Sequence, residues 1–184
     1  MGGIIPFETL NKKGQRILLR SATIVDASAI LQLSYDVIGE DETLVTTTEE
    51  FNVTLDQQKE FIHFYSSAPL NCIIVAEYNN DIIGMLTFQC ETLKKFSHHG
   101  TIGMIVNKRW RGTGVGKTLL TTIIEWAHDQ PFLEKLCLEV VASNKNAISL
   151  YKKLGFIEEG RQVQQVKNLK GEYDDMILMG KFLY

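Results

Sequence analysis

The 184-residue chain is long enough for one domain with a full hydrophobic core, and its net charge of −3 gives no support for a nucleic-acid or membrane-surface binder. The three cysteines, Cys72, Cys90 and Cys137, lie far apart without a CxxC pair, which is typical of a reduced cytoplasmic protein and argues against a disulfide framework or a zinc site. No signal peptide and no apolar run near the ~20 residues of a membrane span are expected.

The first part of the chain is predicted to contain a loose arm, a short strand, a helix, an acidic loop and a second helix. The corresponding ranges are 1–15, 17–22, 23–37, 39–50 and 55–65. Either Thr23 or Asp26 can open the first helix, because both are good N-cap residues. The apolar spacing that follows is helical.

Beyond Pro69 the pattern predicts a hairpin, a third strand, a helix, a strand, a helix and two final strands. Their ranges are 72–78 with 82–89, 99–106, 115–127, 135–141, 144–154, and 157–168 with 173–182. The predicted order is therefore β-αα-βββ-α-β-α-ββ, an α/β or α+β arrangement with helices on both faces of one sheet. We expect a single domain over residues 1–184.

A Gly-rich stretch, RGTGVGK at 111–117, leads directly from the third strand toward a helix. Backbone N–H groups at such a helix N-terminus bind anions, and phosphate is the usual one. A Walker A loop fails because Arg111 stands where its first Gly is required, and a dinucleotide fingerprint fails because Lys117 replaces its third Gly. The pattern Arg-x-x-Gly-x-Gly, from Arg111 to Gly116, does fit.

Three segments in this order resemble the GNAT superfamily of acetyl-CoA-dependent N-acetyltransferases: the strand GMIV ending at Val106, RWRGTGVGKTLL at 109–120, and LEVVASNKNAISLYKKLGF at 138–156. The resemblance covers nearly the whole chain. It implies a mixed, mostly antiparallel sheet of about seven strands, acetyl-CoA as the acetyl donor, and a primary amine as the acceptor.

The resemblance also implies the residues that bind acetyl-CoA. The third strand would pair with the pantetheine arm as an added strand does, and the Gly-rich loop would hold the pyrophosphate. These residues are Met104, Ile105, Val106, Arg111, Gly112, Thr113, Gly114, Val115, Gly116, Lys117, Asn144 and Tyr151. Val115 is expected to point into the protein, and a side chain at Gly114 or Gly116 is expected to exclude the phosphates.

Three residues have both a functional and a plain structural interpretation. Asn144 matches an Asn that fixes the cofactor, and it is also a good helix N-cap. Tyr151 matches a Tyr that donates a proton to the leaving thiolate, or it is a core residue. Glu139 matches a general base on the strand beside the cofactor, or it is a strand-edge carboxylate.

Other acids could line an acceptor site, although a solvated loop explains them as well. These are Glu40, Asp41, Glu77 and Asp81. His98 and His99 could line its mouth, but two His residues do not make a metal site, and no metal is expected. No cysteine lies in a motif for an acyl-enzyme, so direct transfer in a ternary complex is expected.

The tail, with Gly-Glu-Tyr-Asp-Asp at 171–175, resembles a branch that contains amino-acid, polyamine and ribosomal-protein acetyltransferases. A small-molecule amine is the first expected acceptor, and a protein N-terminus or lysine is the second. A non-catalytic acetyl-CoA-binding module is a rival. No nucleic-acid or membrane partner is expected, whereas a homodimer would cover free sheet edges.

Overall fold

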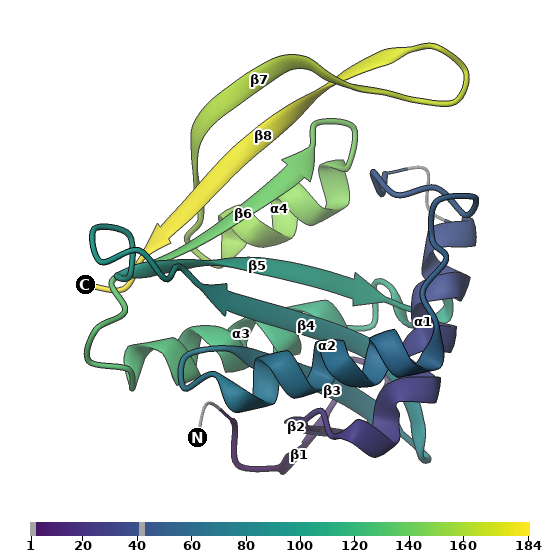
Figure 1. Cartoon of the computed structure of the whole chain (residues 1–184), viewed down its shortest axis with the longest axis vertical. Helices are drawn as coiled ribbons and strands as arrows, with labels where there is room; N and C mark the ends of the chain where they lie inside the picture. Colours follow the sequence, from purple (N-terminus) through teal and green to yellow (C-terminus); the bar gives the residue numbers. More distant parts are fainter. Residues whose placement is uncertain (1–2, 41–42) are drawn as a thin grey trace.

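The computed structural model describes residues 3–40 and 43–184, which form one eight-stranded sheet with helices on both faces (Figure 1). The strands follow the order β1-β2-β3-β4-β5-β6-β8-β7, and neighbouring strands are antiparallel except for β5 and β6. The strands are β1 (Phe7–Leu10), β2 (Arg16–Ser21), β3 (Cys72–Tyr78), β4 (Asp81–Cys90), β5 (His99–Val106), β6 (Lys135–Val141), β7 (Ile157–Lys167) and β8 (Tyr173–Phe182). The helices are η1 (Ile24–Asp26), α1 (Ala27–Glu40), α2 (Leu55–Ser67), η2 (Lys108–Trp110), α3 (Val115–His128) and α4 (Lys145–Lys153).

The two faces of the sheet are covered by different helices. A Cβ built on Gly84 of β4 would lie 3.2 Å from side-chain atoms of Val115 and Leu119, so this side of β4 faces α3. On the opposite side, the Tyr65 hydroxyl of α2 donates to Gln89 Oε1 at 3.2 Å. Because side chains alternate along a strand, the even-numbered residues of β4 from Gly84 to Cys90 point toward α3 and the odd-numbered ones from Met85 to Gln89 toward α2.

The main core lies between the sheet and the pair α3 and α4, and a smaller core lies under α1 and α2. The apolar spacing of 115–127 predicted a buried helix face, and the structure confirms it. Fully buried side chains in this layer are Leu86, Phe88, Leu119, Leu120 and Ile123. The predicted fold class and the order of elements from residue 17 onward are also confirmed.

One prediction about the N-terminus is wrong. Residues 7–10 form β1, which pairs with β2 from Phe7↔Leu19 to Leu10↔Arg16, so this part of 1–15 is not a loose arm. The sheet accordingly has eight strands instead of about seven. β1 has no buried face, since Phe7 is 40% and Leu10 is 62% exposed. Without a buried face, a strand has no alternation for a pattern to reveal.

The two outer strands differ in length and regularity. β1 has only four residues. β7 has eleven, exposed along nearly their whole length, and the pairing with β8 shifts register between Glu158 and Gly160 and again between Gln162 and Val166. Together β7 and β8 form the long hairpin that extends beyond the rest of the molecule in Figure 1.

Among the described residues, no helix is both long and apolar enough to cross a membrane.

Candidate active site

The centre of the sheet contains an opening between β5 and β6. These parallel strands pair only from His99↔Lys135 to Thr101↔Cys137. Beyond that point β5 continues along β4 to Val106, and β6 continues along β8, each with one edge unpaired. The opening, called here the β5–β6 gap, is closed near His99 and widens toward the C-terminal ends of both strands (Figure 1).

Hydrogen bonds at the two ends of the β4–β5 pair show which backbone groups of β5 face this gap. Glu91 N donates to His99 O at 3.0 Å, and Asn107 N donates to Ile83 O at 2.9 Å. Bonded positions alternate along an antiparallel strand, so the odd-numbered residues of β5 bond to β4. The even-numbered residues, Met104 among them, turn their N–H and C=O groups toward the gap.

This geometry narrows the set of β5 residues expected to bind the cofactor. Ile105 lies opposite Met85 in the β4–β5 ladder, so its backbone groups bond to β4 and not to a group in the gap. The Val106 carbonyl accepts a hydrogen bond from Arg111 Nε at 3.0 Å. Ile105 therefore offers no backbone group to the gap, whereas Met104 and the N–H of Val106 face it, and the binding of acetyl-CoA by these three residues stays a prediction.

The Gly-rich loop follows β5 at the open end of the gap. Gly112 and Gly114 have φ values of +75° and +104°, a left-handed backbone that residues with side chains rarely adopt. The amide of Thr118 bonds to the Gly114 carbonyl at 3.0 Å as the first bond of α3. The helix amides before it have no intrahelical acceptor, and the positive end of the helix dipole lies with them, so the loop suits a phosphate.

Two side chains of this loop region are buried. Val115 is 1% exposed, so its side chain points inward as expected. Thr113 is also buried, and its hydroxyl donates to a nearby backbone carbonyl at 2.7 Å. A Cβ on Gly116 would lie 3.5 Å from both Leu150 and Met104, which is ordinary contact. A methyl at Gly116 would thus point toward Leu150 and Met104, and the expectation that a larger side chain there excludes the phosphates stays a prediction.

Tyr151 lies on α4 with its ring in the core. It is 7% exposed, and its ring centroid is 5.9 Å from that of Phe156. Within the described chain, the buried polar side-chain atoms without a partner belong to Gln58 and His99 alone, so the Tyr151 hydroxyl, which has no hydrogen-bond partner there, keeps some contact with solvent. Burial raises the pKa of Tyr151 to about 12. Its phenol therefore stays protonated well above the pKa of about 8.5 of a free thiol.

Asn144 caps α4 and also makes a long-range contact. Its Oδ1 accepts from Ala147 N at 3.2 Å, and its Nδ2 donates to Thr43 Oγ1 at 2.9 Å. Thr43 belongs to the loop after α1, which packs on β4 and β5, whereas Asn144 follows β6. The pair therefore joins the two sides of the β5–β6 gap. The structural role of Asn144 as a helix cap is confirmed, and its role in binding the cofactor remains a prediction.

Glu139 lies on β6 and faces the same side of the sheet as α1 and α2. Its neighbours Leu138 and Val140 are buried in the main core on the other side, and side chains alternate along a strand. The Glu139 carboxylate is exposed, and no described residue forms an ion pair or hydrogen bond with it. Thr101 and Gly103 of β5 are exposed on this same side. We call these three residues, Thr101, Gly103 and Glu139, the β5–β6 floor.

Two of the other acids expected near an acceptor, Glu77 and Asp81, lie on β3 and β4 and not on the strands that border the β5–β6 gap. Glu77 forms an ion pair with Arg20 at 2.8 Å between β2 and β3. Asp81 begins β4 at an exposed turn, also away from the gap. Glu40 is the last residue of α1, and Asp41 falls outside the described residues.

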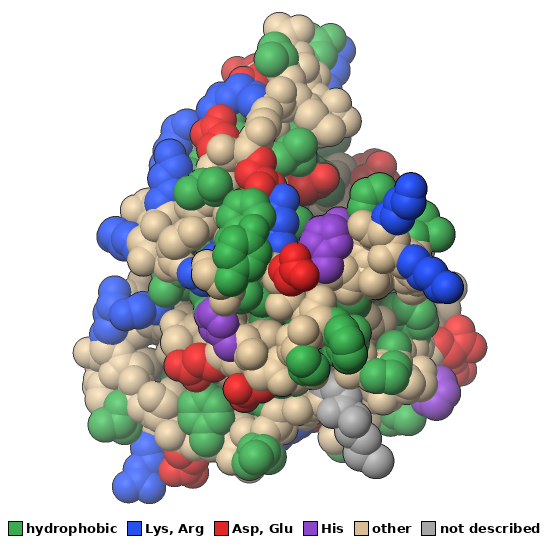
Figure 2. All heavy atoms as spheres, turned by 90° about the vertical axis from the view of Figure 1, so that its left-hand side faces the viewer, with side chains coloured by type: hydrophobic (Ala, Val, Ile, Leu, Met, Phe, Trp, Pro, Cys, Tyr) green, Lys and Arg blue, Asp and Glu red, His purple; other side chains and the backbone are tan. Residues whose placement is uncertain are grey.

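His98 and His99 lie at the closed end of the gap instead of its mouth. His99 pairs with Lys135, whose Nζ is 2.7 Å from a carboxylate oxygen of Glu159. Burial lowers the pKa of His99. Figure 2 shows the face of the molecule that lies at the left-hand side of Figure 1, and on it histidines lie among acidic, basic and hydrophobic side chains. Within the described part of the chain, no group of three or more His, Cys, Asp or Glu is arranged to hold a metal.

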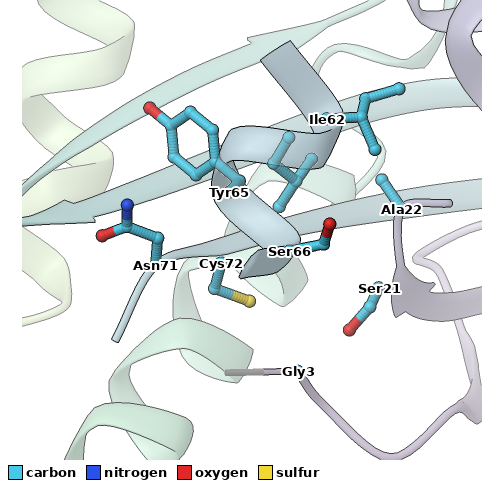
Figure 3. Close-up of a pocket in the computed structure, with 9 residues that line it drawn as sticks. Gly3, Ser21, Ala22, Ile62, Tyr65, Ser66, Asn71 and Cys72 are labelled. Atoms are coloured by element: carbon cyan, nitrogen blue, oxygen red, sulfur yellow. The ribbon is translucent and has the colours of Figure 1, made fainter. Parts of the chain in front are cut away.

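Two hollows of the molecule lie apart from the gap. One, of about 180 Å³, lies between the N-terminal segment, α2 and the start of β3 (Figure 3). Its lining residues are Gly3, Ser21, Ala22, Ile62, Tyr65, Ser66, Asn71, Cys72 and Ile73. A shallower hollow of about 450 Å³ lies beside η1 and α2. Neither cavity is lined by the Gly-rich loop, Tyr151 or Glu139.

The residues around the gap fit the acetyl-CoA that the sequence resemblance implies. Unpaired backbone groups of β5 suit an amide-bearing arm that lies in the gap like an added strand. The left-handed glycines and the free amides of α3 suit its phosphates. The Tyr151 hydroxyl and the Glu139 carboxylate supply one proton donor and one proton acceptor on elements that border the gap.

Comparisons with known proteins agree with this geometry. Residues 40–156 match the model of the acetyltransferase (GNAT) family. An L-amino acid N-acetyltransferase of Escherichia coli is 32% identical over 108 residues, which cover 59% of this chain and 66%, just under two thirds, of that protein. An N-alpha-acetyltransferase of Sulfurisphaera tokodaii is 26% identical over 178 residues, covering 91% of this chain and 94% of that protein.

Among solved structures, an acetyltransferase of the GNAT family from Streptococcus pneumoniae has a TM-score of 0.86 and 28% identity. The superposition covers 90% of this chain and 99% of that one. The likeness thus includes both halves of the sheet on either side of the β5–β6 gap.

Proposed function

Because the chain belongs to the acetyltransferase (GNAT) family, we propose that it transfers the acetyl group of acetyl-CoA directly to a primary amine within a ternary complex. The observation that carries this proposal is the β5–β6 gap. The two strands separate after Thr101 and Cys137, and the Gly-rich loop stands at the open end. A sheet with a gap of this kind offers backbone groups to an extended ligand without unfolding any strand.

In this proposal the backbone of β5 and the Gly-rich loop hold acetyl-CoA between them. Met104 and Val106 bind its arm, and the amides of 112–117 bind its phosphates. When bound, acetyl-CoA supplies a thioester whose acetyl carbon accepts the amine nitrogen and whose sulfur leaves as thiolate. The Met104 N–H, which faces the gap, is the group suited to polarise the acetyl carbonyl, a role typically worth about 10²–10³ in rate.

The cysteines support direct transfer over a covalent acyl-enzyme. Burial raises the pKa of Cys72 to about 12, and it also raises the pKa values of Cys90 and Cys137. The thiolate is the nucleophilic form of cysteine, so a raised pKa makes each thiol a poor nucleophile at neutral pH. Cys137, although it pairs with Thr101 at the end of the gap, is therefore not assigned a chemical step.

Two side chains move the protons. We assign Glu139 as the base that takes a proton from the acceptor ammonium, directly or through water, because its carboxylate is exposed on the β5–β6 floor. We assign Tyr151 as the acid that protonates the leaving thiolate, because its phenol is accessible and stays protonated. The raised pKa keeps Tyr151 in the protonated form that a proton donor requires.

The acceptor proposed first is the amine of a small molecule, such as an amino acid or a polyamine. The E. coli relative, an L-amino acid N-acetyltransferase, supports this class. The second candidate is a protein N-terminus, which the open β5–β6 floor could admit and which is consistent with the S. tokodaii N-alpha-acetyltransferase, similar over 91% of this chain. A domain that binds acetyl-CoA without turnover is the rival, and it would need neither Glu139 nor Tyr151.

The proposal is tested by measuring free thiol released from acetyl-CoA with a panel of amino acids, polyamines, aminoglycosides and short peptides. Thermal unfolding with and without acetyl-CoA is measured in parallel. Thiol release with one amine class identifies both the enzyme and its acceptor. Stabilisation by acetyl-CoA without release from any panel member favours a larger protein acceptor or the non-catalytic module. Absence of stabilisation contradicts the proposed function.

Glu139→Gln is expected to reduce kcat/KM about 10–100-fold near pH 7 and to have little effect near pH 9.5. A lysine-like amine with a pKa of about 10.4 costs roughly 4–5 kcal/mol to neutralise at pH 7, whereas an α-amine of pKa about 8 costs only about 1 kcal/mol. A base therefore matters most when the acceptor is protonated. The measurement is the pH profile of kcat/KM for wild type and variant.

Glu125→Gln provides the control for this experiment. Glu125 is an exposed carboxylate on α3, on the opposite side of the sheet, so its removal changes net charge equally without touching the β5–β6 floor. Its pH profile should match wild type. An equal loss of activity near pH 7 and near pH 9.5 for Glu139→Gln would mean that Glu139 has a structural role.

A further inference from the structure

The turn between β1 and β2 is built around one buried polar side chain. Asn11 is 8% exposed, and its Oδ1 accepts from Lys13 N at 2.9 Å and from Gln15 N at 3.0 Å. Its Nδ2 donates to Gln15 Oε1 at 2.9 Å. Gly14 has a φ of +74°, which completes the tight turn. This set of bonds fixes Lys12 and Lys13 at the tip of a well-defined hairpin.

The same turn contacts the Gly-rich loop, although about 100 residues separate the two in sequence. Lys12 N donates to Thr113 O at 2.8 Å. A Cβ built on Gly114 would lie 3.4 Å from Lys12 Cγ and 4.0 Å from Lys12 Cδ, so the aliphatic part of Lys12 covers Gly114. Gly114 is the N-cap of α3, the residue directly before the free helix amides. The Lys12 ammonium, on its flexible stem, is therefore within reach of an anion bound there.

Positive charge is concentrated on the two segments that meet at this contact. Residues 9–22 and 107–124 contain several Lys and Arg residues and no Asp or Glu, in a chain whose net charge is −3. In the first segment Arg16 pairs with Glu8, and Arg20 pairs with Asp26 and Glu77. Within the described residues, Lys12 forms no ion pair.

We propose that Lys12 is a further cofactor-binding residue, whose ammonium contacts a phosphate of acetyl-CoA held by the Gly-rich loop. This inference rests on the proposed function. The first hairpin would then be part of the cofactor site, in addition to the loop and α3. Either the pyrophosphate or the 3′-phosphate of CoA has the chemistry to accept this contact.

The test is the Kd of acetyl-CoA for wild type, Lys12→Gln, Lys12→Arg and Lys13→Gln at low ionic strength. Lys12→Gln keeps the backbone N–H that bonds to Thr113 O, so the hairpin stays attached. It is expected to weaken binding about 3–10-fold, an effect that shrinks at high salt because the charges are exposed. Lys12→Arg should bind like wild type. Lys13→Gln, the matched control, removes the same charge from the same turn and should change Kd less than about twofold.

Repeating the titrations with acetyl-3′-dephospho-CoA separates the two phosphate sources. A loss of affinity in Lys12→Gln with both ligands assigns the contact to the pyrophosphate. A loss with acetyl-CoA alone assigns it to the 3′-phosphate. If Lys12→Gln binds acetyl-CoA with the affinity of wild type, or if Lys13→Gln loses as much affinity as Lys12→Gln, this inference is overturned while the proposed function stays intact. Failure of wild type to bind acetyl-CoA overturns both.

Discussion

Tyr151→Phe is expected to lower kcat by about 10²–10⁴-fold and to leave the affinity for acetyl-CoA nearly unchanged. The substitution removes only the hydroxyl, which forms no hydrogen bond within the described chain, and it keeps the ring that packs near Phe156. Folding should therefore be preserved while the proton for the leaving thiolate is lost. Steady-state kinetics and a titration with acetyl-CoA measure the two quantities.

Tyr65→Phe is the matched control for this variant. Tyr65 is also 7% exposed, and burial also raises its pKa, but it lies on α2 beside the cavity of Figure 3. Its kcat should remain within about threefold of wild type. If Tyr151→Phe has an unchanged kcat, Tyr151 is not the acid.

The raised pKa of Tyr151 also predicts how the rate of acetyl transfer depends on pH. Because burial raises the pKa of Tyr151 to about 12, its protonated form, which is the active form of an acid, persists through the alkaline range. The rate should therefore rise as the acceptor amine loses its proton and should show no decline from Tyr151 below about pH 11. A descending limb near pH 9 that is absent in Tyr151→Phe would contradict this assignment of the pKa.

Gly114→Val is expected to weaken acetyl-CoA binding by more than about 100-fold, which corresponds to about 2.8 kcal/mol. Gly114 has a φ of +104°, and a β-branched residue is strongly disfavoured there. The added atoms would also meet Lys12, whose Cγ is 3.4 Å from the Cβ position. Both effects displace the loop and the first amides of α3, which the proposal assigns to the phosphates. Isothermal titration with acetyl-CoA measures the loss.

Two further variants separate the causes of this effect. Gly116→Ala places its methyl at ordinary contact distance from Leu150 and Met104, in an ordinary backbone conformation, so binding should change less than about threefold. Gly114→Asn tolerates a positive φ better than Val and should retain more affinity. Equal binding by Gly114→Val and wild type would remove the loop from the cofactor site. Circular dichroism of each variant verifies that it is folded.

Much of the fold follows from local signals that the sequence displays directly. Asn144 and Gly155 bracket α4 because one side chain caps an amide and the other residue adopts a φ of +88°. β3, β5 and β6 have the bounds expected from their apolar runs. β1 was missed because its exposed side chains give no alternation, and its strand character comes only from pairing with β2.

The residue types of the candidate site could be proposed from the sequence, but its geometry could not be predicted from it. Whether Met104 or Ile105 faces the gap depends on which of them bonds to β4, and that register is a tertiary property. The inward direction of Gly116 depends on Leu150, and the contact of Asn144 with Thr43 crosses 101 residues. The contact between Lys12 and the Gly-rich loop likewise has no local signal in the sequence.

The two edges of the sheet have a consequence for how the protein behaves at high concentration. A long, flat edge strand is a template on which other chains can aggregate. Here β1 ends after four residues, and β7 is bent by two register shifts, with Gln164 in a left-handed conformation. Bulges twist an edge and interrupt its row of free hydrogen-bonding groups. Both borders of the sheet are therefore poor templates for edge-to-edge pairing with the strand of another chain.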